Sequence, residues 1–460
     1  MQILTQWIAQ MSDFLWDNIL LFLLLGTGIF FTFRLKFIQI RRFGQGFRFL
    51  FGGLRKKKHD GSDGGMSSFQ ALTTAIAAQV GTGNITGCAT AIVSGGPGAV
   101  FWMWVSAFFG MATIYAEAVL AQKFKVKENG HLSGGPVYYI RAVFQGRFGK
   151  ILAGFFSVAI IVALGFAGNM VQSNSIGSAF ENAFGIPSII VGIFVAICAA
   201  FIFIGGTKRV ASFTEKIVPF MACFYIVGCL ICIGIHYASV ADAFRQIFVA
   251  AFQPQAIAGG VVGVTVQKAM RFGVARGLFS NEAGMGSTPH AHALAKVDRP
   301  QQQGAVAMVG VFVDTFIILT LTALVILTSG VFGSGADGAV LAQAAFDTSF
   351  GAFGSAFIAI CMLFFAFSTI IGWHFFGLIN VRWLFKGKGT KIYSAIVVLF
   401  IALGSCLKVE FVWNISDLFN GLMVIPNCIA LLALSGLVAK ICKQDRTPAS
   451  KLEQTLQDDQ

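Results

Sequence analysis

The chain has 460 residues, of which 56% are apolar, only 12% are charged and 49 are phenylalanine. Because about a quarter of the residues in an ordinary soluble protein are charged, this composition excludes that class and favours a membrane protein. The formal net charge of +13 would suit a nucleic-acid partner, but the positions of the basic residues along the chain give a different explanation.

Eleven apolar segments each have the length, about 20 residues, that a helix needs to cross a membrane. They are roughly 14–33, 67–95, 98–122, 151–175, 187–205, 214–236, 254–275, 304–329, 351–383, 392–407 and 412–438. The sequence therefore predicts an all-α polytopic membrane protein with about 11 transmembrane helices.

The basic residues indicate how these helices are oriented. When the loops are assigned alternately to the two sides of the membrane, all 33 lysines and arginines except Arg245 and Lys408 fall on one side. They lie in 34–66, 121–150, 206–216, 268–299, 382–391 and the tail. Because basic loops stay in the cytoplasm, we expect the N-terminus outside and the C-terminus inside, in the plasma (inner) membrane. The charge then reports topology, and we expect no nucleic-acid partner.

The helices divide into two groups of five. Residues 1–33 form an extracytoplasmic N-terminus and a first helix, and 34–66 a basic cytoplasmic connector. Five helices follow in 67–236 and five in 254–438, and 439–460 form a cytoplasmic tail. Since the two groups begin on opposite sides of the membrane, the pattern predicts an inverted repeat.

Glycine clusters interrupt the first helix of each group, at Val80-Gly81-Thr82-Gly83-Asn84 and Gly259-Gly260-Val261-Val262-Gly263. A helix broken inside lipid exposes backbone groups that a substrate or an ion can satisfy, so paired breaks indicate a transporter's binding site. A free half-helix N-terminus attracts a carboxylate, exposed carbonyls suit sodium, and Asn84 adds a side-chain carbonyl. Close helix packing through small residues is the alternative explanation.

Further polar residues lie within the apolar segments. Ser368 and Thr369, after Phe365, could complete an oxygen-only cation site, or their hydroxyls could bond to their own helix. Trp373, one turn after Thr369, could cap a pocket, and Gln79 just before the first break could line it.

Intramembrane ionisable and amide residues are candidates for function, with helix-to-helix hydrogen bonding as the alternative. The acidic candidates are Glu117, Asp314 and Asp417, and the amide candidates are Gln172 and Asn174.

The sequence shows no sign of an enzyme or a metalloprotein. It has no phosphate-binding loop and no cofactor motif, and Ser280-Asn281-Glu282-Ala283-Gly284 falls in a basic loop without a catalytic triad pattern. His290 and His292 are spaced so that their rings diverge on a helix, which argues against zinc. We therefore expect no catalytic residues, no cofactor, no transition metal and no obligate protein partner.

Several longer motifs resemble the alanine or glycine:cation symporter family. They are Gly81-Thr82-Gly83-Asn84-Ile85, Gly95-Gly96-Pro97-Gly98, Gly134-Gly135-Pro136-Val137-Tyr138-Tyr139, the run from Gly273 to Gly284, and Phe419-Asn420-Gly421-Leu422-Met423 with Ile425-Pro426-Asn427. The resemblance covers nearly the whole chain. It implies a leucine-transporter type of five-plus-five inverted repeat and sodium-coupled, in some members proton-coupled, uptake of small neutral amino acids.

The resemblance also implies roles for individual residues. The carbonyls of Ala77, Val80 and Phe365 and the hydroxyls of Ser368 and Thr369 would hold the coupling sodium. The N–H groups around Gly81, Thr82 and Gly83 would hold the substrate carboxylate, and the pocket would include Gln79, Asn84, Gln172, Gly260, Val261 and Trp373.

The chain departs from the family pattern at several places. Gln79 stands where threonine is usual, Val261 where phenylalanine is usual, and His374-Phe375-Phe376-Gly377-Leu378 where Ser-Tyr-Tyr-Gly-Glu is usual. These changes add two candidate substrates to alanine and glycine: glutamine, a larger neutral amino acid, and serine. The sequence is also compatible with coupling to protons and with an amino-acid channel.

Overall fold

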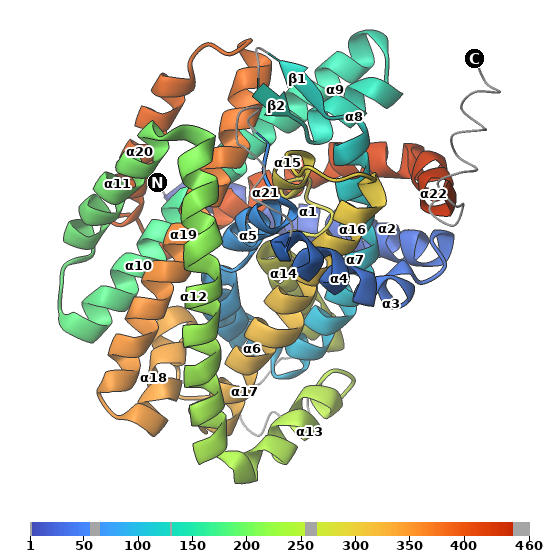
Figure 1. Cartoon of the computed structure of the whole chain (residues 1–460). Coiled ribbons are helices and arrows are strands. Elements are labelled where there is room, and N and C mark those ends of the chain that lie inside the picture. The colour runs from blue at the N-terminus through green and yellow to red at the C-terminus, as the bar shows by residue number, and fades with distance from the viewer. Residues whose placement is uncertain (1, 56–64, 129–130, 254–264, 445–460) are drawn as a thin grey trace.

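The computed structural model describes residues 2–55, 65–128, 131–253 and 265–444, and nearly all of them are helical (Figure 1). The helices of the first part are α1 (Gln2–Leu15), α2 (Leu21–Arg34), α3 (Ile38–Arg41), α4 (Phe43–Arg55), α5 (Ser68–Gln79), α6 (Cys88–Gly95), α7 (Gly98–Lys123), α8 (Pro136–Val143), α9 (Gly146–Ile160), α10 (Asn169–Phe184), α11 (Ser188–Ile204), α12 (Gly206–Ile235) and α13 (Val240–Ala250). Those of the second part are α14 (Val266–Asn281), α15 (Pro289–Ala293), α16 (Pro300–Val311), α17 (Thr320–Thr328), α18 (Gly338–Phe350), α19 (Phe353–Leu384), α20 (Thr390–Gly404), α21 (Val409–Ala433) and α22 (Ser435–Gln444).

Short irregular helical segments and one hairpin complete the fold. The π-helical segments are η1 (Trp16–Leu20), η3 (Gly83–Gly87), η4 (Ile161–Gly168) and η7 (Phe312–Leu319), and η5 (Tyr237–Ser239) is a 3-10 turn. The strands β1 (Val126–Glu128) and β2 (His131–Ser133) pair antiparallel, with Val126 opposite Ser133. Because η4 joins α9 to α10 and η7 joins α16 to α17, each of these pairs forms one long rod.

Seven helices of the described chain are long and apolar enough to cross a membrane. They are Thr5–Arg34, Gly98–Lys123, Gly146–Phe184, Gly206–Ile235, Pro300–Thr328, Phe353–Leu384 and Glu410–Ala433, and the helices Ser188–Ile204 and Thr390–Gly404 are apolar but shorter. All nine overlap segments expected from the sequence, so the prediction of an all-α polytopic protein is confirmed. The total of eleven spans stays a prediction, because 67–95 is interrupted between α5 and α6 and residues 254–264 lie outside the described part of the chain.

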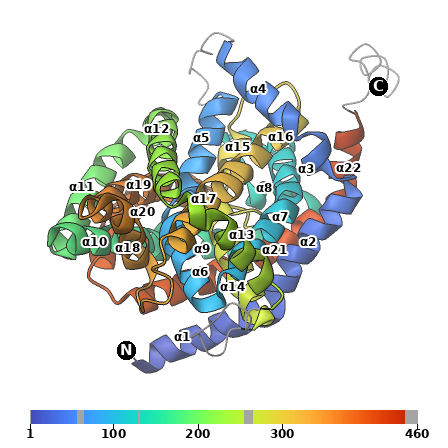
Figure 2. The same ribbon diagram turned by 90° about the horizontal axis from the view of Figure 1, so that it is seen from below.

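The helices surround two short, interrupted elements. Figure 2 shows α10, α11, α12, α18, α19 and α20 gathered on one side of the molecule and α2, α7 and α16 on the other. The first interrupted element, α5 followed by α6, lies against the second, α14 followed by α15. Since α14 contacts α6 and α15 contacts α5, the two elements run antiparallel, as members of oppositely oriented halves would.

The first interruption follows α5, which begins with a capping box between Ser67 and Gln70. The helix ends at Val80, whose ψ of 90° leaves the helical region. Glycine is needed after this point because the chain passes very close to its neighbours. A Cβ atom on Gly81 would collide with the Thr369 hydroxyl, and one on Gly83 would lie 3.0 Å from the Ser280 Cα.

A second interruption lies further along the chain than the cluster Gly259–Gly263, whose predicted break stays a prediction. The cluster Gly259–Gly263 lies outside the described residues, and α14 runs without a break to Asn281. The interruption begins there, with left-handed backbone at Glu282 (φ 56°), Gly284 (φ 86°) and Gly286 (φ 83°). A second short helix, α15, starts at Pro289.

Residues 268–299, predicted as a cytoplasmic loop, are therefore mostly helix and buried chain, and residues 277–295 are all buried. The prediction relied on the basic residues of this stretch, but α14 also carries small residues that let it approach α7. A Cβ atom on Gly273 would collide with the backbone carbonyl of Ala99. The arginines of α14 are instead neutralised by acidic residues of other elements.

Candidate functional site

Two hydroxyls of α19 face the carbonyl end of α5. The Thr369 hydroxyl lies 2.9 Å from the Ala77 carbonyl oxygen and 3.4 Å from that of Val80. The Ser368 hydroxyl lies 3.3 Å from the Ala77 oxygen, and both hydroxyls also reach the Phe365 oxygen, at 2.8 and 3.1 Å. The structure thus brings together all five residues proposed as sodium ligands, in a fully buried cluster of neutral oxygen atoms. We call these five residues the hydroxyl cluster.

Side-chain amides occupy the backbone donors of the first interruption. The Gly81 N–H donates to Asn84 Oδ1 at 3.0 Å, and the Thr82 N–H donates to Gln172 Oε1 at 3.2 Å. Gln172 is on α10, so this helix contacts the break directly. The two N–H groups predicted to hold a carboxylate therefore donate to neutral amide oxygens.

Asn84 connects the first interruption to a buried acid. Its amide donates to the Asp314 carboxylate at 2.7 Å, and this carboxylate also accepts from Ser280 at 2.9 and 3.1 Å and from Thr315 at 2.8 Å. Gln79 completes the contact between the two interruptions, because its amide donates to the Asn281 carbonyl at 2.7 Å. Asp314 is thus buried with neutral donors from three elements.

A second acid holds the backbone of the second interruption. Glu117, on α7, accepts from the N–H groups of Gly284 at 3.0 Å and of Gly286 at 2.9 Å. The Asn427 amide donates both to Glu117 at 2.7 Å and to the Gly284 carbonyl at 2.9 Å. Glu117 and Asn427 therefore satisfy exposed backbone groups that would each cost several kcal/mol inside a membrane.

The third acid, Glu282, is the first residue of the second interruption. Its carboxylate accepts hydrogen bonds from the Trp373 indole and from the Ser287 hydroxyl. Trp373 lies on α19 one turn after Thr369 and packs against Gly168, where a Cβ atom would collide with the ring. Trp373 therefore stands between the hydroxyl cluster and Glu282.

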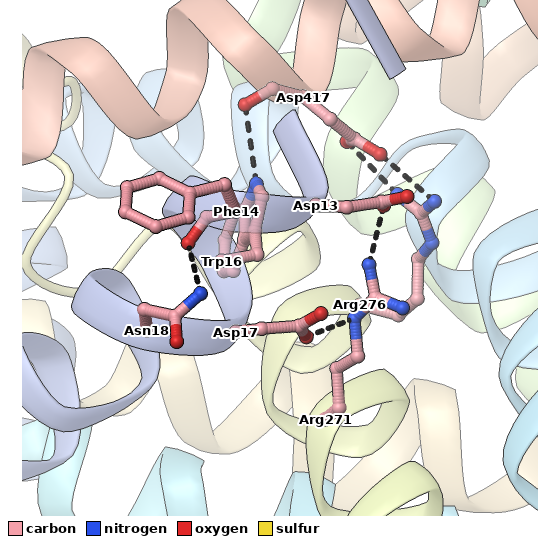
Figure 3. A network of polar contacts seen from close by, with 8 residues as sticks. All are labelled: Asp13, Phe14, Trp16, Asp17, Asn18, Arg271, Arg276 and Asp417. Atoms are coloured by element: carbon pink, nitrogen blue, oxygen red, sulfur yellow. Dashed lines mark hydrogen bonds and ion pairs between the residues drawn. The ribbon is translucent and has the colours of Figure 1, made fainter. Parts of the chain in front are cut away.

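A network of ion pairs involves two arginines of α14 (Figure 3). Arg276 forms a two-pronged pair with Asp417 at 2.9 Å for both contacts, and its guanidinium stacks 4.6 Å from the Trp413 ring centre. Arg271 binds Asp13 and Asp17, each at 2.6 Å. The Trp16 indole donates to the Asp417 carbonyl at 3.2 Å. These contacts tie α14 to the N-terminal helix and to α21.

The structure places the remaining candidates as follows. Asp417, considered as an intramembrane acid, is paired with Arg276. Asn174 donates to the carbonyls of Gly404 and Leu407, at 3.0 and 2.9 Å, and so serves helix-to-helix bonding. Gly260 and Val261 lie outside the described residues.

Several buried polar atoms near the interruptions have no hydrogen-bond partner within the described chain: Gln79 Oε1, Thr82 Oγ1, Gln172 Nε2 and Ser173 Oγ. Gln79 Oε1 lies beside α16, 2.8 Å from where a Cβ atom on Gly310 would stand. Because an unsatisfied buried polar group is costly, these atoms fit a site that takes a polar ligand.

The sequence did not reveal Glu282, Ser280 and Asn427 as parts of this centre, and it indicated Glu117 without a role. One signal was available. Gly284-Met285-Gly286 repeats the spacing of Gly81-Thr82-Gly83 directly after a helix, and glycines so spaced mark backbone that leaves the helical region.

The profile of the sodium:alanine symporter family matches residues 1–457. The chain belongs to this family. It is 44% identical over 438 residues to the sodium/alanine symporter AgcS of Methanococcus maripaludis, covering 94% of this chain and 95% of that protein. It is 40% identical over 439 residues to the probable sodium/glutamine symporter GlnT of Bacillus subtilis, covering 95% and 90%. The symporter is thus a multi-pass membrane transporter and not an enzyme.

Solved structures agree on the fold. The symporter matches MhsT in complex with L-phenylalanine with a TM-score of 0.57 at 13% identity, covering 84% of this chain and 100% of that one. It matches a sodium-coupled sialic acid symporter with a TM-score of 0.53 at 12% identity, covering 88% and 83%. Both likenesses concern architecture only, and they support the expected leucine-transporter type of fold.

Proposed function

We propose that this symporter takes up small neutral amino acids together with sodium by alternating access. The observation that carries the proposal is the hydroxyl cluster: three carbonyls and two hydroxyls from α5 and α19 converge where the first helix breaks. Oxygen ligands without a formal charge suit a hard monovalent cation and need no proton exchange. Binding there would join α19 to the interrupted element, and this joining makes the ion's affinity depend on conformation.

The substrate carboxylate belongs at the first interruption in this proposal. The N–H groups of Gly81 and Thr82 point to it, and Gln172 Nε2, which has no partner in the described structure, adds a donor. The carboxylate would take over donors now held by the Asn84 and Gln172 oxygens. Because a charged acceptor makes stronger hydrogen bonds than a neutral amide, this exchange is favourable.

Alanine or glycine is the first choice for the substrate, supported by the family and by the relative named as a sodium/alanine symporter. Glutamine is the second choice. It is supported by the Gln79 Oε1 atom, which has no partner among the described residues and can accept from a side-chain amide, and by the relative named as a probable sodium/glutamine symporter.

Transport by reconstituted protein tests the proposal. Vesicles with an inward sodium gradient should accumulate labelled alanine above the outside concentration, and vesicles without the gradient should only equilibrate. Flux that ignores the gradient would instead favour an amino-acid channel. Competition by the twenty amino acids then ranks the substrates, and strong inhibition by glutamate or lysine with none by alanine would overturn the assignment.

Proton coupling is the competing proposal, supported by the buried acids Asp314 and Glu117. Uptake at fixed sodium over a range of external pH separates the two ions. Dependence on sodium at every pH supports sodium, and uptake that persists without sodium and follows a pH gradient supports the proton.

The proposed orientation keeps the N-terminus outside and the C-terminus in the cytoplasm of the inner membrane. The basic residues of α14 no longer count as residues of a cytoplasmic loop; they are Lys268, Arg271 and Arg276. The reason is that α14 pairs with Asp13 and Asp17 of the N-terminal segment. The remaining basic loops still share one side, so the rule supports the same orientation.

A further inference from the structure

Glu282 is a buried carboxylate with only neutral partners. Its side chain is fully buried, its hydrogen bonds come from the Trp373 indole and the Ser287 hydroxyl, and no ion pair of Glu282 exists within the described chain. A buried carboxylate without a cation is costly unless it is protonated or unless a ligand supplies the positive charge.

Glu282 is flanked by residues that contact the first interruption, where a ligand is expected. Ser280, two residues earlier, packs directly on Gly83, and Asn281 holds Gln79 through its carbonyl. On the other side, Trp373 lies one turn after Thr369, whose hydroxyl lies against Gly81. Glu282 is thus held between two arms that both contact the first interruption.

The other two buried acids have different surroundings. Glu117 uses its oxygens on two backbone N–H groups and on the Asn427 amide, so its bonds are filled by parts of the fold. Asp314 accepts from Asn84, Ser280 and Thr315, which surround it on three elements. Glu282 has the fewest protein donors of the three, and one of them belongs to Trp373, a residue expected to line the pocket.

We propose that Glu282 is the anionic partner of the substrate's α-ammonium group. This inference rests on the proposed function, because it places the substrate carboxylate at the first interruption and adds the second contact of a zwitterion. An α-amino acid carries opposite charges one carbon apart, and the two interruptions then present complementary groups: N–H donors at Gly81 and Thr82, and a carboxylate at Glu282.

The pairing explains how binding can favour amino acids over other small carboxylates. Lactate has the size of alanine but carries a neutral hydroxyl in place of the ammonium. It would leave the Glu282 carboxylate without a cation in a buried site, so the protein would reject it. A charge-assisted bond of this kind discriminates by about 30-fold or more.

Competition between alanine and lactate tests the inference. Uptake of labelled alanine under a sodium gradient is measured with increasing unlabelled L-alanine or L-lactate, for the wild type and for Glu282→Gln and Glu282→Ser. In both variants the preference for alanine over lactate should fall by about 30-fold or more. Glu181→Gln, an acid at the exposed end of α10, is the matched control and should keep the wild-type ratio.

A second measurement does not require turnover. Sodium should raise the thermal melting temperature of all these proteins, since the hydroxyl cluster is intact in each. L-alanine should add a further rise in the wild type, and in the Glu282 variants alanine and lactate should shift the melting temperature alike. Glu282→Asp keeps the charge and should keep the preference for alanine.

Three results would overturn the inference. The first is a preference for alanine over lactate in Glu282→Gln or Glu282→Ser that equals the wild-type preference. Loss of the sodium-dependent stabilisation in both neutral variants is the second, because it would give Glu282 a role in the fold. The third is an unchanged preference for alanine over lactate together with alanine uptake that no longer depends on pH, which would make Glu282 a proton carrier. If the wild type itself shows no sodium-driven alanine uptake, the proposed function fails instead.

Discussion

The two interrupted helices expose similar backbone and satisfy it with different chemistry. At the first, the N–H groups of Gly81 and Thr82 meet neutral amide oxygens of Asn84 and Gln172. At the second, the N–H groups of Gly284 and Gly286 meet the full carboxylate of Glu117. Hydrogen bonds to a charged acceptor are about twice as strong as neutral ones.

This difference separates an exchangeable site from a fixed one. An incoming carboxylate can replace a neutral amide oxygen with a gain in hydrogen-bond strength, so the first interruption is suited to a ligand. The second is already held by a charged group, and Asn427 braces it from α21. We therefore expect substitutions of Glu117 and Asn427, which hold the second interruption, to harm folding, and substitutions at the first interruption to harm binding.

Glu117→Gln should have the largest effect. A glutamine has only one acceptor oxygen for the two N–H groups and the Asn427 amide, and it adds donors that face other donors. We expect a loss of about 3 kcal/mol or more in stability, measured as a lower melting temperature and poor expression. Glu181→Gln is the control, and a wild-type melting temperature for Glu117→Gln would show that the carboxylate does not hold the loop.

The double variant Ser368→Ala with Thr369→Ala should come next. It removes both hydroxyls of the hydroxyl cluster and keeps the three carbonyls. With about 1–1.5 kcal/mol for each, the sodium concentration for half-maximal uptake should rise by about 30- to 150-fold. Thr328→Ala is the control, because that hydroxyl bonds only to carbonyls of its own turn. Wild-type sodium dependence in the double variant would refute the assignment.

The sequence could show the first interruption but not the second. Gly81 and Gly83 lie in an apolar stretch, where closely spaced glycines indicate a break in the helix. Ser368 and Thr369 are recognisable in the sequence as adjacent hydroxyl residues. The basic residues of α14 made its sequence resemble a loop, because their partners Asp13, Asp17 and Asp417 are far away in the chain. The role of Glu117 depends on contacts with residues 167 and 169 positions later, and no local pattern encodes such a pairing.

Gln172→Glu should have a smaller effect, confined to the substrate. It keeps the oxygen that accepts from Thr82, removes the unpartnered Nε2 donor and adds a negative charge beside the carboxylate site. The half-saturating alanine concentration should rise by about tenfold, with the sodium dependence nearly unchanged. Gln172→Met removes both polar groups without adding charge and should cost only a few-fold. An effect of equal size in the two variants would show that charge at this position is irrelevant.

Asp417→Asn should have the smallest effect, because it lies outside both interruptions. The pair with Arg276 is partly exposed, at 14% for each side chain, and Arg276 keeps its contact with Trp413 when the charge is lost. The Trp413 ring centre lies 5.0 Å from that of Phe279, which lies 5.8 Å from that of Trp373, so a column of aromatic rings links the ion pair to the proposed pocket. Weakening the pair should ease separation of α14 from α21 and speed alanine dissociation by a few-fold, with little change in melting temperature.

Dissociation of labelled alanine from purified protein measures this rate, with Asp242→Asn, in the exposed pair with Arg245, as the control. A slower or unchanged rate would show that the pair of Arg276 and Asp417 does not restrain the exit of substrate.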